Sequence, residues 1–206
     1  MPDWIEYICH DCFRIRDKEH GLVIYTDPYK LNHDHEKADI ILITHSHFDH
    51  CSPPDVRKIQ KPDTVIVTTQ DCADKIAGNI ERVSPGLTMT VKGIKIKAVA
   101  AYNTNKKYHP KANNWCGYVF TVNGKNIYLA GDTDKIPEMS DLGEIDIALL
   151  PVSGTYVMTP EEAAQACNEL IKPKLAIPMH YGVIIGDKGD AERFKELCEC
   201  EVEILK

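Results

Sequence analysis

The chain has 206 residues, of which 43% are hydrophobic and 27% are charged, the composition of an ordinary water-soluble globular protein. Its length fits one domain that spans residues 1–206. A formal net charge of −7 argues against a dedicated nucleic-acid binder, which needs a basic face, so we expect no nucleic-acid partner.

The start of the chain, Met1-Pro2-Asp3-Trp4, has no basic stretch followed by an apolar run, and no apolar run reaches the length of a membrane span. We therefore expect a cytoplasmic protein with no membrane partner. In that compartment the eight cysteines are expected to be reduced. Cys9 and Cys12 have C-x-x-C spacing, but in a strand their side chains would face opposite sides, which argues against a redox or metal-binding pair.

Apolar and β-branched runs predict the strands of the chain. In order they cover 22–25, 40–44, 63–69, 94–98, 118–122, 125–129, 145–152, 175–179 and 202–205. Asn123-Gly124, between two of these runs, is a strong signal for a tight hairpin. Because later strands alternate with helices, the pattern is compatible with two packed sheets covered by helices.

Helices are predicted between these strands, at 55–61, 71–78, 160–171 and 190–199. Ser52 followed by two prolines is typical of a helix start. Thr159-Pro160-Glu161-Glu162 combines a capping box with a proline at the first helical position, so the helix that follows has a well-defined beginning.

The densest cluster of reactive side chains directly follows the apolar segment 40–44. It consists of His45, His47, Asp49 and His50. Strand periodicity would turn His45 and His47 to one side, and a turn could then aim Asp49 and His50 at an adjacent point. A solvated polar loop would not need this combination, whereas imidazole and carboxylate groups at this density suit zinc, manganese or iron. The motif therefore predicts a site that can hold two metal ions.

The spacing HxHxDH resembles the signature of the metallo-β-lactamase superfamily. Two later blocks keep the order of that family: Gly131-Asp132-Thr133 follows the strand at 125–129, and His180 follows the strand at 175–179. An early Asp27-Pro28 after a strand also matches, and the segment 9–15 is similar to a Gly-His-x-x-Phe strand of small hydrolases related to ascorbate-6-phosphate lactonase and N-acyl-phosphatidylethanolamine phospholipase D. The resemblance implies a mixed α/β fold, a four-layer αββα sandwich with metals at one edge between the sheets.

The resemblance also implies the ligands of a dinuclear metal-dependent hydrolase. It assigns His45 and His47 to metal one, Asp49 and His50 to metal two, Asp132 as a bridge, and His180 to the second site. The expected cofactors are two divalent ions, Zn²⁺ first, with Mn²⁺ or Fe²⁺ as alternatives. A metal-bound hydroxide would then be the nucleophile, with Asp49 and Asp132 as the catalytic carboxylates around it.

One position departs from the family pattern. Asn103 stands where the family places a third histidine for metal one, and an amide is a poor zinc ligand. His109 could fold back from the following loop and supply the imidazole; otherwise metal one would have fewer protein ligands, bind weakly or carry extra water. We expect His109 to be the ligand, because two imidazoles alone would make a weak zinc site.

Four further residues are expected near the metals. His10 matches the early histidine of the family and should line the site. Asp27 is expected to accept hydrogen bonds from ligand imidazoles, although a simple turn aspartate before proline is nearly as good an interpretation. Tyr156 and Tyr181 lie in loops that should surround the metals, where each could donate to a transition-state oxygen or simply pack.

These residues together predict hydrolysis of an ester, lactone or phosphodiester. Because Lys106, Lys107 and Lys111 make the loop after Asn103 basic, the substrate is expected to be a small, anionic molecule. Two alternatives stay open: a catalytically weakened metal-binding protein, which Asn103 favours, and a nuclease-type phosphodiesterase, for which the chain lacks room for a gripping insertion. A di-iron oxygen-reducing protein would need glutamate in place of His47. Loops 29–37 and 103–114 are expected to set the choice of substrate, so the sequence does not name it, and it does not give the oligomeric state either.

Overall fold

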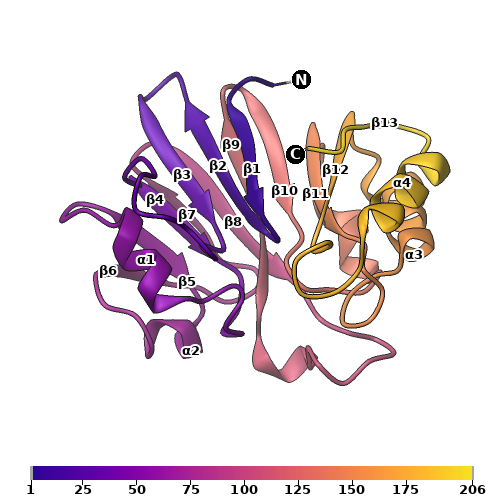
Figure 1. Cartoon of the computed structure of the whole chain (residues 1–206), viewed down its shortest axis with the longest axis horizontal. Helices are drawn as coiled ribbons and strands as arrows, with labels where there is room; N and C mark the ends of the chain where they lie inside the picture. The colour runs from indigo at the N-terminus through magenta and orange to yellow at the C-terminus, as the bar shows by residue number, and fades with distance from the viewer. Residues whose placement is uncertain (1, 206) are drawn as a thin grey trace.

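The computed structural model describes residues 2–205 and contains two β-sheets packed face to face (Figure 1). The first sheet joins, in spatial order, β1 (Ile5–Cys9), β2 (Cys12–Asp17), β3 (Leu22–Thr26), β4 (Ile40–Ile43), β5 (Val65–Thr68) and β6 (Asn79–Arg82). The second joins β13 (Glu201–Val202), β12 (Leu175–Met179), β11 (Ile147–Pro151), β10 (Lys125–Leu129), β9 (Cys116–Val122), β8 (Ile94–Ala100) and β7 (Thr88–Val91). Both sheets are mixed, with antiparallel strands on one side and parallel strands on the other.

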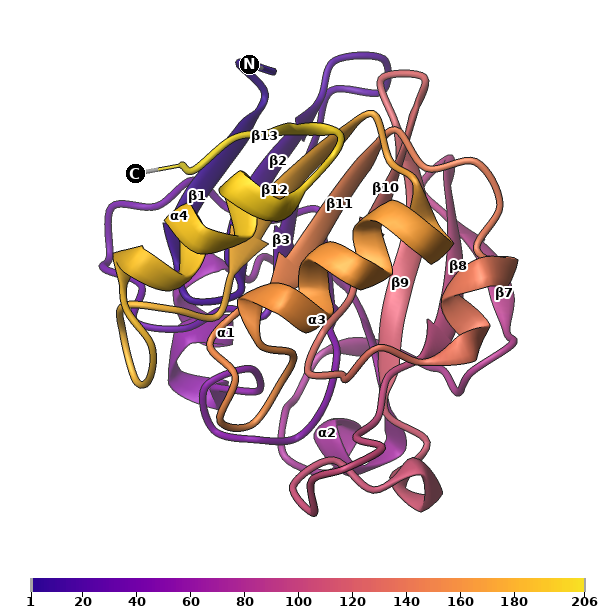
Figure 2. The ribbon, with the colours of Figure 1, turned by 90° about the vertical axis from the view of Figure 1, so that its right-hand side faces the viewer.

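Helices cover the outer face of each sheet. The first sheet is covered by α1 (Pro53–Ile59) and the single-turn α2 (Gln70–Ala73), which bury Val56, Ile59 and Cys72 against it. The second is covered by α3 (Pro160–Gln165), a π-helix that continues it (Ala166–Ile171), and α4 (Lys188–Leu197), as Figure 2 shows. Two 3₁₀ turns, Lys111–Asn113 and Pro137–Asp141, lie in the connections. The expected αββα layering is confirmed.

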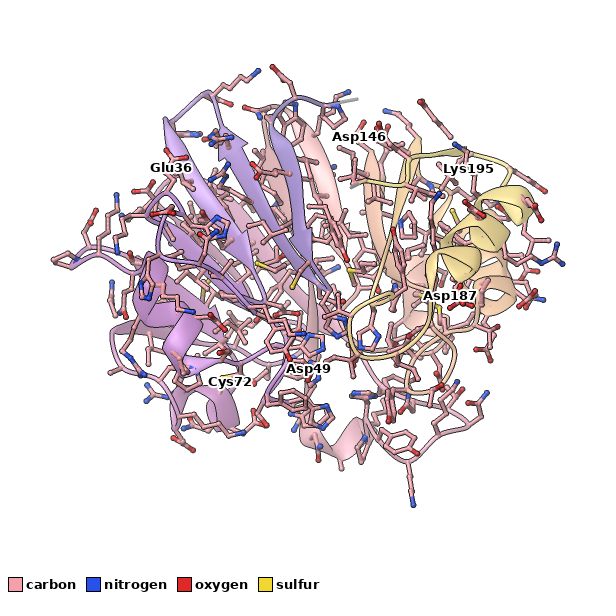
Figure 3. The ribbon with its side chains drawn as sticks, viewed as in Figure 1. Glu36, Asp49, Cys72, Asp146, Asp187 and Lys195 are labelled. Atoms are coloured by element: carbon pink, nitrogen blue, oxygen red, sulfur yellow. The ribbon has the colours of Figure 1, made fainter. Side chains whose placement is uncertain are left out.

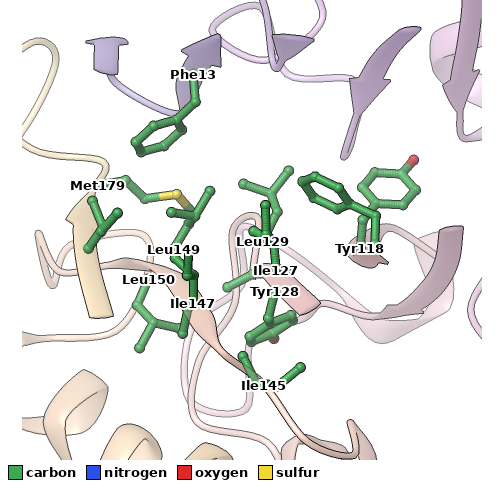
Figure 4. Packing of buried hydrophobic residues seen from close by; sticks show 14 of the residues in the cluster. Phe13, Tyr118, Ile127, Tyr128, Leu129, Ile145, Ile147, Leu149, Leu150 and Met179 are labelled. Carbon is green, nitrogen blue, oxygen red and sulfur yellow. The ribbon is translucent and has the colours of Figure 1, made fainter. Parts of the chain in front are cut away.

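The core between the sheets follows from the alternation of side chains along each strand. Phe13 from the first sheet points toward Leu129 and Leu149 of the second (Figure 4). Tyr128 and Leu150, the next residues along, point to the opposite face, beneath the helices. Burying each such side chain contributes about 1.5–3 kcal/mol relative to leaving it exposed. The two faces of the second sheet are therefore both apolar, as a sheet covered on both sides requires.

Parallel strands fix where the polar residues collect. The carboxyl ends of β3 and β4 in one sheet, and of β10, β11 and β12 in the other, lie at the same edge of the sandwich. Side chains that directly follow these strands must therefore meet there, as ligand sites do in other sheets with parallel strands. Figure 3 shows Asp49 at this edge, below the strand ends.

The structure corrects three expectations about the elements. The segment 9–15 is not one strand, because β1 and β2 form a hairpin with His10 and Asp11 in its turn. Cys9 and Cys12 are opposite each other in the register of the two strands, and both are free thiols. The alternation argument against a Cys9–Cys12 pair was therefore wrong in its premise. The helix expected at 71–78 ends at Ala73, and the polar strands β6 and β7 were not expected.

Local turn chemistry was predicted more accurately. Asn123 and Gly124 both have positive φ angles, 52° and 69°, and join β9 to β10. The capping box at α3 is present, since Thr159 and Glu162 exchange hydrogen bonds of 3.1 and 2.9 Å. Within residues 2–205, no helix has both the length and the apolar character that a bilayer crossing requires.

Candidate metal centre

Two groups of four donor side chains lie at the shared edge of the sheets. In each group, one ligand-type atom per residue lies within 4.8 Å of all the others. The first group is His45, His47, His109 and Asp132, and the second is His10, Asp49, His50 and His180. Seven of these eight residues are buried and His47 is half-buried. The structure thus brings all seven predicted ligands together and adds His10 to the second group.

Asp132 lies between the two groups. Its Oδ2 is 3.0 Å from His109 Nε2 and 3.2 Å from His180 Nε2, while its Oδ1 is 3.3 Å from His50 Nε2. Gly131 makes this position possible: its φ is +64°, and a Cβ there would come within 3.1 Å of the Thr44 side chain. A glycine before Asp132 lets the β10 end approach the β4 end closely.

Four of the imidazoles are held by a hydrogen bond at Nδ1. The partners are Thr44 Oγ1 for His45 (2.9 Å), Asp27 Oδ2 for His50 (2.8 Å), Ser153 Oγ for His180 (3.0 Å) and Asn103 Oδ1 for His109 (3.0 Å). An ionised carboxylate can only accept, so a proton of His50 lies on Nδ1, and its Nε2 is turned toward Asp132. This is how proteins orient imidazoles toward a metal.

The buried polar atoms left without partners fit a pair of cations. The Nε2 atoms of His50, His109 and His180 and the Oδ1 of Asp132 are buried and make no well-aligned hydrogen bond within residues 2–205. Unpaired buried polar groups are costly, and each one calls for an explanation. Imidazole nitrogen and carboxylate oxygen are the donors that zinc, manganese and iron accept, so the residues present suit such ions.

The charges of the centre are arranged around Asp132. Burial lowers the pKa of His45 well below its usual range and the pKa of His10 to about 4, so both rings are neutral. Burial disfavours charge on His180 too, but Asp132 and Asp11 raise its pKa to about 9. His180 and His50 in turn hold the pKa of Asp132 well below its usual range against the effect of burial. A bound cation would replace these protons as the partner of Asp132.

Asn103 lies behind His109 rather than among the donors. Its Nδ2 donates to Asp134 Oδ1 (3.1 Å) and to the Tyr156 carbonyl (2.9 Å), which leaves its Oδ1 to accept from both the backbone N–H (2.9 Å) and Nδ1 of His109. The backbone N–H of Asn103 also donates to the carbonyl of His109 (2.8 Å). The loop between them is therefore folded back, with His109 directed at Asp132.

The hairpin turn holds a carboxylate that the sequence interpretation missed. Asp11 is fully buried, neither of its oxygens has a hydrogen-bond partner within the described residues, and Oδ2 lies 3.9 Å from His50 Nδ1. Burial raises the pKa of Asp11 to about 7. Its neighbour His10 has a φ of 55°, and Asp27 and His180 also have positive φ. Such backbone costs about 1–2 kcal/mol per residue and is typical of functional sites.

The aromatic residues take different positions from those expected. Tyr181 stacks on Tyr7, with ring centroids 6.4 Å apart. Tyr156 packs edge-on against Tyr108 at 4.7 Å, so only its backbone carbonyl contacts the centre, through Asn103. The indole next to the first donor group is that of Trp115, whose ring centroid lies 4.8 Å from those of both His45 and His47. No motif singled out Trp115, although it directly precedes strand β9.

The lysines of the loop after Asn103 give less uncompensated positive charge than the sequence suggested. Lys106 pairs with Asp134 at 2.8 Å, and Lys111 pairs with Glu138 at 2.7 Å. Their charges are compensated, so the expectation of an anionic substrate loses two of its three supporting lysines.

Comparison with known proteins identifies the family of the chain. The sequence matches the Beta-lactamase superfamily domain over residues 4–180. A UPF0173 metal-dependent hydrolase of Thermoplasma acidophilum is 36% identical over 202 residues, which cover 91% of this chain and 87% of the relative. The chain belongs to the UPF0173 family of metal-dependent hydrolases, within the β-lactamase superfamily. The match confirms the superfamily expected from the motifs, whereas the narrower lactonase and phospholipase group stays a prediction.

Solved structures agree with the family's fold. A Parabacteroides distasonis protein of known crystal structure is 37% identical, covers 98% of this chain and 93% of its own, and superposes with a TM-score of 0.87. The metallo hydrolase Igni18 of Ignicoccus hospitalis is 25% identical, with a TM-score of 0.79 and coverage of 98% and 94%. Both structures therefore share this fold over nearly the whole length of the chain.

Proposed function

We propose that the chain is a dinuclear metal-dependent hydrolase that cleaves an ester, lactone or phosphodiester bond in a small molecule. The observation that carries this proposal is the position of Asp132, whose two oxygens lie within 3.3 Å of imidazoles from both donor groups. A shared carboxylate is what two adjacent cations need. Zn²⁺ is the first candidate, with Mn²⁺ or Fe²⁺ as alternatives, because the donors are nitrogen and oxygen.

Each donor group would bind one of the two ions. His45, His47 and His109 would hold one ion, Asp49, His50, His180 and His10 the other, and Asp132 both. When bound, the two ions would supply Lewis acidity toward a substrate oxygen and a nucleophile at neutral pH.

Asp49 is the best candidate for the group that accepts the proton of the nucleophile. Burial would raise the pKa of Asp49, but the contact of its Oδ2 with His10 Nε2 (3.1 Å) lowers it, so the carboxylate is ionised and can accept a proton. Asp27 contributes by fixing the ring of His50 and does not itself face the substrate, since it is fully buried. These two carboxylates therefore have separate tasks.

The alternatives have weaker support. A catalytically weakened protein was suggested by Asn103, but Asn103 orients His109 and so helps to complete the first donor group. A nuclease-type activity would need a basic surface, which the net charge of −7 and the paired lysines do not favour. A small-molecule substrate of the lactonase-like type remains the proposal that fits the compact chain.

The test measures metal content and turnover together. Protein purified without chelator should contain up to two equivalents of transition metal. It should hydrolyse an activated ester, a lactone or bis(4-nitrophenyl) phosphate, lose this activity with a chelator and regain it with Zn²⁺ or Mn²⁺. Asp132→Ala should reduce turnover by several orders of magnitude, because Asp132 is shared by both donor groups. Asp141→Ala removes an exposed carboxylate and is the control; equal activity of the two variants would contradict the proposal.

A further inference from the structure

A cleft of about 290 Å³ lies between the free edges of the two sheets. It is lined by β1, by the loop that follows His180, and by the end of the chain after β13. The main apolar lining residues are Tyr7, Ile8, Val183, Ile204 and Leu205. The one lysine at the rim, Lys188, is paired with Glu192 at 3.0 Å. The lining thus offers an apolar surface with little free charge.

The cleft adjoins the second donor group. Cys9 lines it and precedes His10, and Tyr181 lines it and follows His180. The backbone N–H of His180 donates to the carbonyl of His10 at 3.2 Å, and the centroids of the two rings are 4.0 Å apart. The segments that wall the cleft are therefore the same segments that present two of the donors.

The loop that closes the cleft is unusually apolar for a surface turn. It carries the branched apolar residues 183–185 between Gly182 and Gly186, and Ile184 is 39% exposed. A side chain at Gly186 would come within 2.7 Å of Ser153 Cβ, so glycine allows the loop to lie against the residue that orients His180. Within this loop, Val183 lines the cleft and adds to the apolar surface that a ligand would contact.

From these observations we propose that the cleft binds an apolar acyl or alkyl group of the substrate, while the bond to be cleaved lies at the donor groups. The proposal rests on the hydrolase function proposed above and narrows its substrate class. The occupant is part of the substrate, because two residues that line the cleft, Cys9 and Tyr181, are the direct sequence neighbours of His10 and His180. Its volume is near the lower end of small-ligand sites, so it suits a short chain and not a long lipid.

The proposal is tested by varying the length of the acyl group of the substrate. The metal-loaded protein is assayed with 4-nitrophenyl acetate, butyrate, hexanoate and octanoate. Since each buried methylene contributes about 0.8 kcal/mol, kcat/KM should rise about fourfold per added methylene until the cleft is filled. In Val183→Trp, which fills the cleft, the ratio of kcat/KM for hexanoate to that for acetate should fall toward one. Leu87→Trp is the control, because it introduces the same tryptophan at an exposed apolar residue near β7, at the opposite edge of the second sheet from the cleft.

The outcomes separate the two proposals. The cleft proposal is overturned if kcat/KM does not depend on the length of the acyl group, or if that dependence is unchanged in Val183→Trp. The proposed hydrolase function would stand in either case. If no ester is hydrolysed, calorimetry with butyrate, hexanoate and octanoate decides: affinity that increases with length and is lost in Val183→Trp supports the cleft while the ester function fails. Affinity independent of length overturns the cleft in that case as well.

Discussion

Asn103 and His109 form a unit in which one residue supplies the imidazole and the other holds it. Asn103 Oδ1 accepts from both N–H groups of His109, and the Nε2 of His109 is left 3.0 Å from Asp132. An amide that is itself anchored by Asp134 and the Tyr156 carbonyl can fix a ring as well as a backbone carbonyl does. The departure from the family pattern thus moves the donor along the loop without removing it.

This arrangement predicts different losses for the two residues. His109→Ala should reduce the metal content by one equivalent, because it removes a donor atom. Asn103→Ala should keep the stoichiometry at saturating metal but weaken the affinity by about 10- to 100-fold, as loss of an orienting partner does. Titration with Zn²⁺ against a competing chelator measures both. Loss of an equivalent in Asn103→Ala with full content in His109→Ala would mean that the amide is the ligand.

For single residues, the sequence indicated the donors and one of their hydrogen-bond partners, Asp27, but not the other partners. His45, His47, Asp49 and His50 could be predicted because they are contiguous, and His109 because the loop needed an imidazole. Thr44 and Ser153 were not identified, since single hydroxyls after strands are common, although both follow strands that end at the site. Asp11 was missed for another reason: only the hairpin reveals that it is buried.

Among the elements, helix α1 has a buried carboxylate in its first turn that joins it to the loop after β3. Asp55 accepts from the backbone N–H groups of Lys30 and Leu31 (both 3.1 Å), from Ser52 Oγ (2.7 Å) and from Lys58 Nζ (2.8 Å). Burial would raise the pKa of Asp55, but these partners lower it overall. Because α1 follows the metal-binding motif directly, Asp55 also stabilises the segment that carries His50.

Asp55→Asn should lower the free energy of unfolding by about 1–3 kcal/mol at neutral pH, because it weakens charge-assisted hydrogen bonds in a buried place. The pKa is depressed in the folded state, so the stabilisation exists above the unfolded value of about 4 and is lost as the pH falls through the folded value. The difference from the wild type should therefore shrink toward about pH 3. Urea denaturation at both pH values measures it.

Asp63→Asn is the matched control for this change, since the Asp63 carboxylate pairs with Lys92 in solvent and should matter little at either pH. A difference for Asp55→Asn that persists unchanged in acid would show that its charge is not the cause.

Elements with strong periodicity or turn signals were predictable from the sequence, and short polar ones were not. The buried runs that became β4, β5 and β11 needed no tertiary information. Strand β6, with the sequence Asn-Ile-Glu-Arg, has no strand pattern and forms because it completes the parallel edge beside β5. The β1–β2 turn was hidden because His10 takes a left-handed backbone, which residues other than glycine adopt only uncommonly.

In the whole molecule, the donor groups connect the two sheets. His45, His47 and His50 extend from the first sheet, whereas Asp132 and His180 extend from the second. Ions bound at this edge would hold the sheets together, and would stabilise the folded state because the unfolded chain has no such site.

Metal should therefore raise the melting temperature. A free concentration of about 100 times Kd stabilises by about 2.7 kcal/mol, which corresponds to a shift of roughly 5–10 °C for a chain of this size. Scanning calorimetry with and without Zn²⁺ measures the shift, and Asp132→Ala should largely abolish it. Mg²⁺ is the control cation, because it prefers all-oxygen sites and should have little effect. An equal shift with Mg²⁺ would argue against the nitrogen-rich site.

The distribution of donors along the chain also has a consequence for the order of events in folding. His10 and His180 meet across nearly the full length of the sequence, and their backbones are joined by a hydrogen bond of 3.2 Å. Contacts this distant form late, because the intervening chain must first be ordered. Metal capture would then mark the completion of folding, unlike in small zinc domains, where the ion is needed to begin it. A nascent chain still on the ribosome would hold no complete centre until its last strands had emerged.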